Sequence, residues 1–196
     1  MRDTPLLKKM PLGIGGLKSL RILSKFIIEG DNGFSITALK DLKDLQGKIS
    51  IQGLDKVQSV MHAQEANLSQ KRISELEFEW SDVFDDSRKG TLEKELFNVL
   101  KPHNDSLKEL GIVSYGGKEF PNWVGDPSFL RLAHVSINGC KNSTFLPPLG
   151  QLPSLKELFI EGMAMVKVVG PEFRGTSLAF PSLKILSFRD MKGSRS

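Results

Sequence analysis

The chain has 196 residues, of which 39% are hydrophobic and 26% are charged, with a formal net charge of +4. This composition allows a buried core and argues against wholesale disorder. The charges are spread out with no run of five or more of one sign, which argues against a nucleic-acid footprint. No apolar stretch approaches the roughly 18 residues of a membrane-spanning helix, and one cysteine, Cys140, cannot form an internal disulfide, which fits a reducing compartment.

The first distinctive segment, MPLGIGGLKSL, begins at Met10 and superficially resembles a phosphate-binding loop. Such a loop needs two glycines at fixed distances before Lys18, and those positions hold Leu12 and Leu17. The spacing therefore argues against a nucleotide site. Ile14, Leu17, Leu20 and Leu23 instead recur every three residues and lead toward a strand, with the glycines at a turn between repeats.

A repeated pattern of apolar residues continues through the rest of the chain. Five segments match the template L-x-x-L-x-L-x-x-N/C, in which the L-x-L pair is a short strand. They are Ile73-x-x-Leu76-x-Phe78-x-x-Ser81, Leu107-x-x-Leu110-x-Ile112-x-x-Tyr115, Leu132-x-x-Val135-x-Ile137-x-x-Cys140, Leu155-x-x-Leu158-x-Ile160-x-x-Met163 and Leu183-x-x-Leu186-x-Phe188-x-x-Met191. Gln46 leads a partial sixth match, and Leu20 leads a weaker seventh, in which Lys25 fills an apolar slot.

The segments between these strands change character along the chain. Ser35–Leu45, with Ser35 as a plausible N-cap, and Lys56–Lys71 have helical spacing, and a helix over 91–100 should end before Pro102. From about Ser114 onward, proline and glycine predict extended or turn-like returns. The sequence therefore predicts an α/β leucine-rich-repeat solenoid of about six to seven repeats, with a curved parallel sheet on its concave side and helical, then irregular, returns on its convex side.

Several residues that could carry chemistry have simpler explanations. His62, His103 and His134 are too far apart for a metal site, and Cys140 occupies a slot suited to a buried structural cysteine. Core packing is favoured for the large aromatic residues Trp80, Tyr115 and Trp123, and Phe120 and Trp123 should pin a return segment. A solvated loop is the simpler explanation for the carboxylate pair Asp85 and Asp86. No nucleophile, base and stabiliser come together, so we expect no enzyme.

Strand alternation predicts which residues face outward on the concave side. They are Lys48, Ser50, Gln52, Glu75, Glu77, Glu79, Glu109, Gly111, Val113, His134, Ser136, Asn138, Glu157, Phe159, Glu161, Ile185, Ser187 and Arg189. This inner face should be acidic although the chain is basic. Surface charge of this kind can serve solubility alone, or it can dock a basic partner with Phe159 as an apolar anchor.

The resemblance to a known family rests on several longer stretches. They are MPLGIGGLKSLRIL, GFSITALKDLKDLQGKISIQGLDKV, EANLSQK, SLKELGIVSYGGKEFPNWVGD and LPPLGQLPSLKELFIEGM. Together they resemble the leucine-rich-repeat region of plant intracellular nucleotide-binding disease-resistance proteins of the coiled-coil type. The resemblance covers the chain from about Pro5 to Met191.

The resemblance implies a recognition and autoinhibitory role in defence. Such repeats recognise a pathogen effector or a guarded host protein, and they hold the receptor's own nucleotide-binding domain at rest. The ADP/ATP site would lie in that domain, which has no match here, so we expect no cofactor in this chain. Residues 1–196 would form a single array, part of a larger cytoplasmic receptor.

We expect protein partners, no nucleic acid and no membrane span. The candidate contact residues are Glu75, Glu77, Glu79, Glu109, His134, Ser136, Asn138, Glu157, Phe159, Glu161 and Arg189. A generic leucine-rich-repeat scaffold, or a truncated receptor remnant without function, is the alternative.

Overall fold

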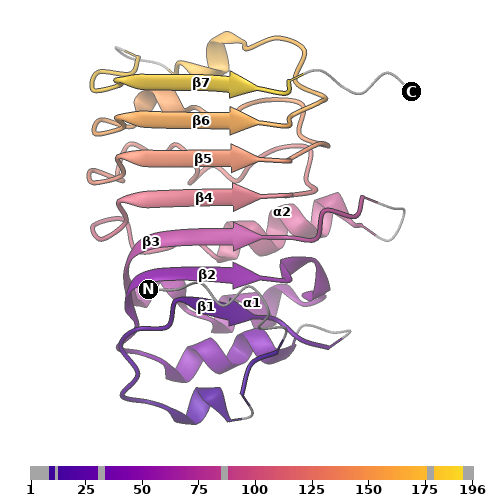
Figure 1. Cartoon of the computed structure of the whole chain (residues 1–196), viewed down its shortest axis with the longest axis vertical. Coiled ribbons are helices and arrows are strands. Elements are labelled where there is room, and N and C mark those ends of the chain that lie inside the picture. The colour runs from indigo at the N-terminus through magenta and orange to yellow at the C-terminus, as the bar shows by residue number, and fades with distance from the viewer. Residues whose placement is uncertain (1–8, 12, 31–33, 85–87, 176–178, 192–196) are drawn as a thin grey trace.

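The computed structural model describes residues 9–11, 13–30, 34–84, 88–175 and 179–191. These residues form one seven-stranded parallel sheet whose strands lie in chain order (Figure 1). The strands are β1 (Lys25–Ile27), β2 (Gln46–Gln52), β3 (Arg72–Glu79), β4 (Glu109–Val113), β5 (His134–Asn138), β6 (Glu157–Glu161) and β7 (Ile185–Arg189). The predicted solenoid and its repeat number are confirmed.

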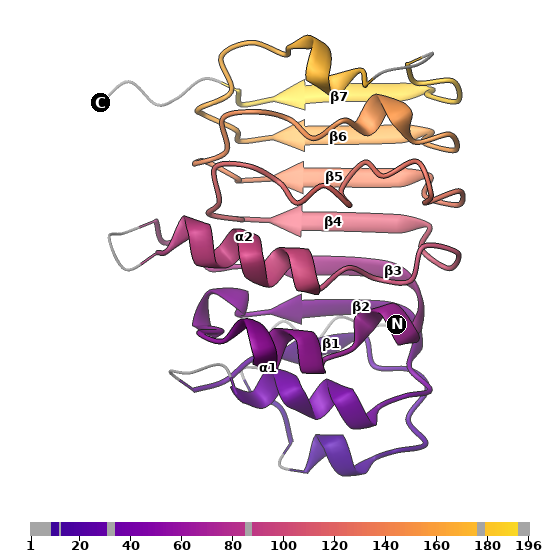
Figure 2. The ribbon, with the colours of Figure 1, turned by 180° about the vertical axis from the view of Figure 1, so that it is seen from behind.

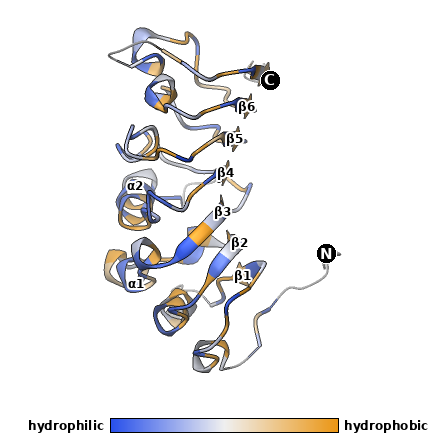
Figure 3. Ribbon diagram, turned by 90° about the vertical axis from the view of Figure 1, so that its left-hand side faces the viewer, coloured by the Kyte–Doolittle hydropathy of each residue, from blue (hydrophilic) through white to orange (hydrophobic). Residues whose placement is uncertain are grey.

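The returns run behind the sheet, and their character changes along the chain as predicted (Figure 2). The two α-helices among the described residues, α1 (Val60–Glu65) and α2 (Gly90–Val99), pack against each other. After β4 the described returns contain only short 3₁₀ helices. All the 3₁₀ helices of the described chain are Ile14–Gly16, Phe34–Asp41, Leu54–Lys56, Leu68–Gln70, Leu149–Gln151 and Pro171–Phe173. Seen from the side, the strands line one face and the returns the other (Figure 3).

The core lies between these two layers and is built from the inward side chains of the strands. Leu76, Leu110, Val135 and Leu158 pair in register across β3 to β6, and each is at most 2% exposed. Burying such a side chain contributes about 1.5–3 kcal/mol. A single repeat cannot bury its own inward face, so the array is stabilised by stacking of neighbours.

Backbone geometry at the ends of the strands keeps the repeats aligned. The residue after the strand lies in the left-handed region at Gly53, Ser114, Gly139 and Gly162. At Gly53 (φ +81°), an added Cβ would also lie 2.9 Å from the carbonyl oxygen of Ile28. Each of these four N–H groups donates to the carbonyl of the next strand, so the sheet's hydrogen bonding continues into the turns.

One local prediction near the start of the chain is wrong, and one apolar residue there is exposed. Lys25 pairs with Ser50 and therefore faces outward, while Phe26 pairs with Ile51 and is fully buried, so the template at Leu20 is out of register by one residue. Leu17 is 53% exposed although the three-residue spacing included it among the apolar positions. A one-residue slip exchanges the two faces of a strand, and Phe26 is the larger apolar side chain available for burial.

The helical returns are shorter and less regular than predicted. Ser35 is not an N-cap, because the 3₁₀ helix begins at Phe34, and the Ser35 hydroxyl accepts from the Glu29 N–H at 2.9 Å. Within Lys56–Lys71 only α1 is α-helical, capped by Ser59, whose hydroxyl accepts from the His62 N–H at 3.4 Å. Asn67, with φ 51°, lies in the left-handed region and stops the helix. The helix over 91–100 is confirmed as α2.

Candidate functional site

The outward side chains of the strands form three rows across the inner face of the sheet. Strand pairing puts one residue from each of β2 to β7 in every row. The first row is Lys48, Glu75, Glu109, His134, Glu157 and Ile185; the second is Ser50, Glu77, Gly111, Ser136, Phe159 and Ser187; the third is Gln52, Glu79, Val113, Asn138, Glu161 and Arg189. All eleven candidate contact residues therefore share one surface, which we call the acidic face.

A hollow of about 420 Å³ lies along the first and second rows of the acidic face, from β2 to β6. It exists because the second row carries little side chain between Glu77 and Phe159, where Gly111 and Ser136 stand. A Cβ added at Gly111 would lie 3.1 Å from Cγ of Glu77, so a larger residue would push that carboxylate aside. The hollow can therefore admit one side chain of a partner.

Carboxylates outnumber cations on the acidic face, and only some of them are paired. Lys48 Nζ lies 3.7 Å from a Glu75 oxygen, and His134 Nδ1 lies 3.3 Å from a Glu157 oxygen. The intervening Glu109 forms no ion pair with any described residue. Because exposed pairs contribute only about 0–1 kcal/mol, a cationic ligand can compete for these carboxylates.

The third row shows how closely the negative charges are crowded. Burial raises the pKa of the Glu79 carboxyl, and the neighbouring Glu77 charge raises it further. The amide of Gln52, which donates to Glu79 Oε2 at 2.6 Å, opposes this shift. Glu77 in turn accepts from the Ser50 hydroxyl at 2.9 Å. A bound cation would relieve the repulsion between the two carboxylates.

Phe159 adds an apolar element to the acidic face. Its side chain is 41% exposed, and it lies in the second row between Ser136 and Ser187. The adjacent inward residues, Leu158 and Ile160, are buried, so the exposure of Phe159 follows from strand alternation. An exposed aromatic ring beside a hollow can anchor a partner's apolar side chain.

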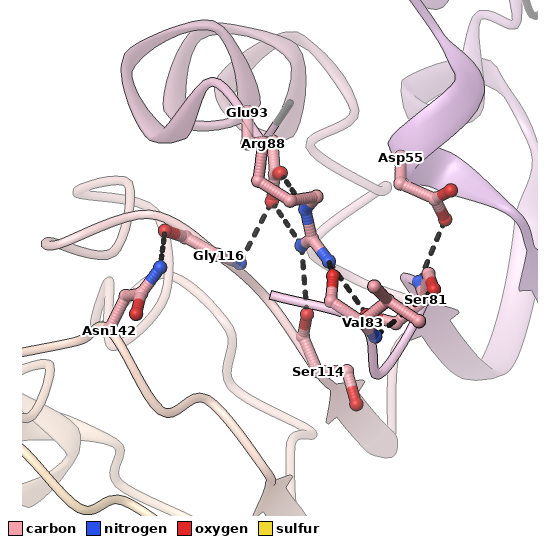
Figure 4. Close-up of polar contacts among 8 residues, drawn as sticks. All are labelled: Asp55, Ser81, Val83, Arg88, Glu93, Ser114, Gly116 and Asn142. Atoms are coloured by element: carbon pink, nitrogen blue, oxygen red, sulfur yellow. Dashed lines mark hydrogen bonds and ion pairs between the residues drawn. The ribbon is translucent and has the colours of Figure 1, made fainter. Parts of the chain in front are cut away.

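Sequence analysis did not find a buried ion pair at the edge where the strands end (Figure 4). Arg88 and Glu93 are almost completely buried, with Arg88 Nη2 donating to Glu93 Oε2 at 2.8 Å. Arg88 also donates to the carbonyl oxygens of Ser81, at 2.7 Å, and Ser114, at 3.0 Å. Glu93 accepts from the Gly116 N–H at 2.8 Å. We call these five residues the Arg88 clasp.

The Arg88 clasp belongs to a longer chain of contacts between repeats (Figure 4). The Ser81 N–H donates to Asp55 after β2, and the Asn142 amide after β5 donates to the Gly116 carbonyl at 3.3 Å. The clasp thus holds Arg88 and the start of α2 against the turns that follow β3 and β4. Arg88 and Glu93 are five residues apart, outside the three- and four-residue helical spacings that would have indicated a pair from sequence.

The other residues singled out from the sequence have structural surroundings. Trp80, Tyr115 and Trp123 are at most 4% exposed, so their predicted core packing is confirmed. Their rings lie 5.1–5.2 Å from that of Phe97, and the Trp123 indole N–H donates to the Phe97 carbonyl. Asp85 and Asp86 lie outside the described residues.

Cysteine and histidine form no assembled centre within the described part of the chain. Cys140 is fully buried, and burial raises the pKa of its thiol to about 12, which keeps it protonated and unreactive. Where the structure describes the residues, no three His, Cys, Asp or Glu side chains are grouped as metal ligands would be. No described helix is long and apolar enough to span a bilayer.

Comparison with known proteins finds similar sequences in plants. The family model of R13L1/DRL21 leucine-rich repeats matches residues 36–163. The chain is 40% identical over 155 residues to the putative disease resistance RPP13-like protein 1 of Arabidopsis thaliana, covering 76% of this chain and 15% of that protein. It is 37% identical over 196 residues to the putative disease resistance protein RGA4 of Solanum bulbocastanum, covering 95% of this chain and 19% of that protein. The chain thus spans less than a fifth of either relative.

Proposed function

The chain belongs to the R13L1/DRL21 family of leucine-rich repeats, and on that premise we propose that it is the protein-recognition module of a plant disease-resistance receptor. Its task is to bind protein, without catalysis. The match to proteins named for disease resistance supports this role. The parallel array supports it physically, since a solenoid presents a long, rigid inner surface.

One observation carries the proposal, namely the acidic face around the central hollow. Six carboxylates stand there against Lys48, Arg189 and His134, and Phe159 lies at the rim. This combination fits a Lys- or Arg-rich segment that also offers an apolar side chain. Opposite charge would speed the encounter and select the partner, and the apolar contact would slow its dissociation.

The biological partner in this proposal is a pathogen effector or a guarded host protein. A second partner is the nucleotide-binding domain of the same receptor, which the repeats would hold at rest until recognition occurs. Any ADP or ATP would bind in that domain, and the module would act inside the cell. The names of the relatives support a receptor of this kind, and the resting-state contact follows from the resemblance to such receptors.

Charge reversal on β3 tests the role of the acidic face. The variant carries Glu75→Lys, Glu77→Lys and Glu79→Lys, which change the middle of the face. A labelled nonapeptide of alternating lysine and leucine serves as the basic probe, and fluorescence anisotropy measures its affinity. We expect the dissociation constant to rise by about tenfold or more, because attraction becomes repulsion.

A matched control separates this surface from net charge. Glu95, Asp105 and Glu172 are exposed and lie in the return segments outside the three rows, so lysine at these positions makes the same change in net charge. The control variant should bind the probe within about twofold of wild type, because these residues lie far from the hollow and salt screens distant charges. Equal losses in the two variants, or unchanged affinity after reversal on β3, would contradict the proposal.

The wild-type chain, the β3 variant and the control variant are then used as baits in plant extract. Proteins retained by the wild-type and control chains but lost with the β3 variant are the candidates, identified by mass spectrometry. We expect a nucleotide-binding receptor domain or a protein with a basic segment among them. If all three baits retain the same proteins, the acidic face is not the recognition surface.

A further inference from the structure

A second charged surface, of opposite sign, runs along the edge where the strands begin, which is the left edge of the sheet in Figure 1. Each strand has a basic residue at its first position or within the four residues before it. The first three are Arg21, Lys43 and Arg72, and the following four are Lys108, Arg131, Lys156 and Lys184. All seven side chains are exposed. We call them the basic edge.

Backbone hydrogen bonds and strand pairing hold the basic edge together within two groups of strands, β1 to β3 and β4 to β7. The Gln46 N–H donates to the Arg21 carbonyl, and Gln46 pairs with Arg72 in the sheet. Arg21, Lys43 and Arg72 line one groove of about 320 Å³. Further along, the Lys184 N–H donates to the Lys156 carbonyl at 2.8 Å.

Ala133, just before β5, links the starts of β4 and β6 through backbone hydrogen bonds. Its N–H donates to the Lys108 carbonyl, and its own carbonyl accepts from the Lys156 N–H. Arg131 lies two residues before Ala133. The seven cations therefore form a band along this edge, with one cation to each strand at a strand spacing of about 4.8 Å, and not a single straight row.

The charge of the basic edge is not neutralised by the described part of the chain. None of its seven side chains forms an ion pair with a described carboxylate. Asp44 lines the groove near Arg21 but makes no such pair. Seven like charges along one edge repel one another, so an anionic ligand would relieve this repulsion.

We propose that the basic edge binds an extended, Asp- and Glu-rich peptide segment of a protein partner. The width of the ligand distinguishes an extended peptide from broader anions. Glu109 and Glu157 directly follow Lys108 and Lys156 and stand in the first row of the acidic face. A bilayer or a nucleic-acid duplex that contacted the edge would also approach these carboxylates. A single extended chain lies along the cations alone.

The dimensions agree with a short peptide. Seven strands have six intervals, which span about 29 Å at a spacing of about 4.8 Å. An extended peptide advances about 3.3 Å per residue, so about nine residues cover the basic edge. The acidic peptide proposed for the basic edge carries the opposite charge from the basic partner proposed for the acidic face. The two proposals can therefore fail independently.

A fluorescein-labelled nonapeptide of glutamate is the probe for the basic edge. Its affinity for the wild-type chain is measured by fluorescence anisotropy at about 50 mM salt, where screening is modest. Lys108→Glu, Lys156→Glu and Lys184→Glu are combined in one variant. We expect its dissociation constant to rise by about tenfold or more, and wild-type affinity to fall as salt increases.

Matched controls use the opposite edge and the acidic face. Lys89, Lys118 and Lys167 are exposed and follow the ends of strands, so glutamate at these positions makes the same change in net charge. This control should stay within about twofold of wild type, because salt screens charges at that distance. The Glu75, Glu77 and Glu79 reversal variant should bind the glutamate peptide no more weakly than wild type.

Two results would overturn the proposal. One is unchanged affinity in the edge variant, or an equal loss in the opposite-edge control. The other is tighter binding to a nine-nucleotide oligothymidylate, or to anionic phospholipid vesicles, than to the glutamate peptide. If the edge variant does not give a folded circular dichroism spectrum, Lys→Gln at the same three positions replaces it, and the same comparison with the control decides.

Discussion

The two edge strands of the sheet differ in burial although each pairs with only one neighbour among the described strands. Phe26 in β1 and Phe188 in β7 occupy the same inward column, yet Phe26 is fully buried and Phe188 is 39% exposed. Met10, Ile14, Leu20 and Leu23 pack against the core at the β1 end. No described strand lies beyond β7. The comparison teaches that burial in this array depends on what covers a repeat and not on the repeat's own sequence.

The largest expected effect is a direct test of this contrast. Phe26→Ala should lower the free energy of unfolding by about 3–5 kcal/mol, because it leaves a cavity in a fully covered site. Phe188→Ala should cost about 1 kcal/mol or less, since its ring is already partly in water. Chemical denaturation of both variants measures the difference. Equal losses would show that β7 is as well covered in solution as β1.

The Arg88 clasp sharpens the comparison by adding a site in the interior of the array. Arg88→Ala should destabilise the chain by about 3 kcal/mol, because it leaves the buried Glu93 carboxylate without its partner. Arg189→Ala, on the exposed strand β7, should change stability by about 0.5 kcal/mol or less. Denaturant titration of the two variants tests this, and a comparable cost for both would argue against the clasp as a stabilising feature.

The exposed edge at β7 should also produce self-association. Ile185, Leu186 and Phe188 together present an unpaired apolar edge, so we expect concentration-dependent oligomers in light scattering. Leu186→Lys should weaken this association about tenfold, or about 1.4 kcal/mol. Ile22→Lys, at an exposed apolar position near β1, should leave it unchanged. A wild-type chain that stays monomeric at high concentration would rule out this edge as an association site.

The smallest expected effect lies on the acidic face, away from both ends. The folded state raises the pKa of Glu79 above its ordinary value of 4.5, so the folded chain keeps this proton at pH values where the unfolded chain has lost it. Ionisation of Glu79 therefore reduces stability as pH rises above that ordinary value. Glu79→Gln should raise the melting temperature by about 1 °C near pH 7, with the gain vanishing below about pH 4.

Glu161→Gln provides the control for this pH effect. Glu161 lies in the same row of the acidic face, but on β6 beside Asn138 and Arg189. Thermal melts followed by circular dichroism at both pH values compare the two variants. A gain for Glu79→Gln that persists at low pH would show that ionisation of the Glu79 carboxyl is not its source.

The repeat pattern was sufficient to predict the fold and the membership of the acidic face. Register followed from apolar alternation wherever two strong inward residues stand two apart, as Leu76 and Phe78 do, because a slip would expose both. The prediction of register was wrong at β1, where Leu23 and Lys25 matched the template poorly and Phe26 is the buried residue. The biological role of the acidic face stays a prediction.

Features that depend on contacts between repeats were not predictable from the sequence. Arg88 and Glu93 gave no recognisable spacing, and the position of Arg88 depends on its hydrogen bonds to the carbonyls of Ser81 and Ser114. The hollow likewise needed the alignment of Gly111 with Ser136 across two strands. Ser35 illustrates the same limit, because its hydroxyl bonds to Glu29 in place of a helix terminus.

The periodic order of apolar residues specified the parallel strands, the change from helical to irregular returns and the side chains on each face, because alternation and turn chemistry are local properties of the backbone. Tertiary structure decided how deeply each residue is buried, where the ion pairs form and which edge is covered. Most of those outcomes depend on residues 23 or more positions apart, such as His134 and Glu157, being brought within contact, and stacking of whole repeats is what supplies that proximity.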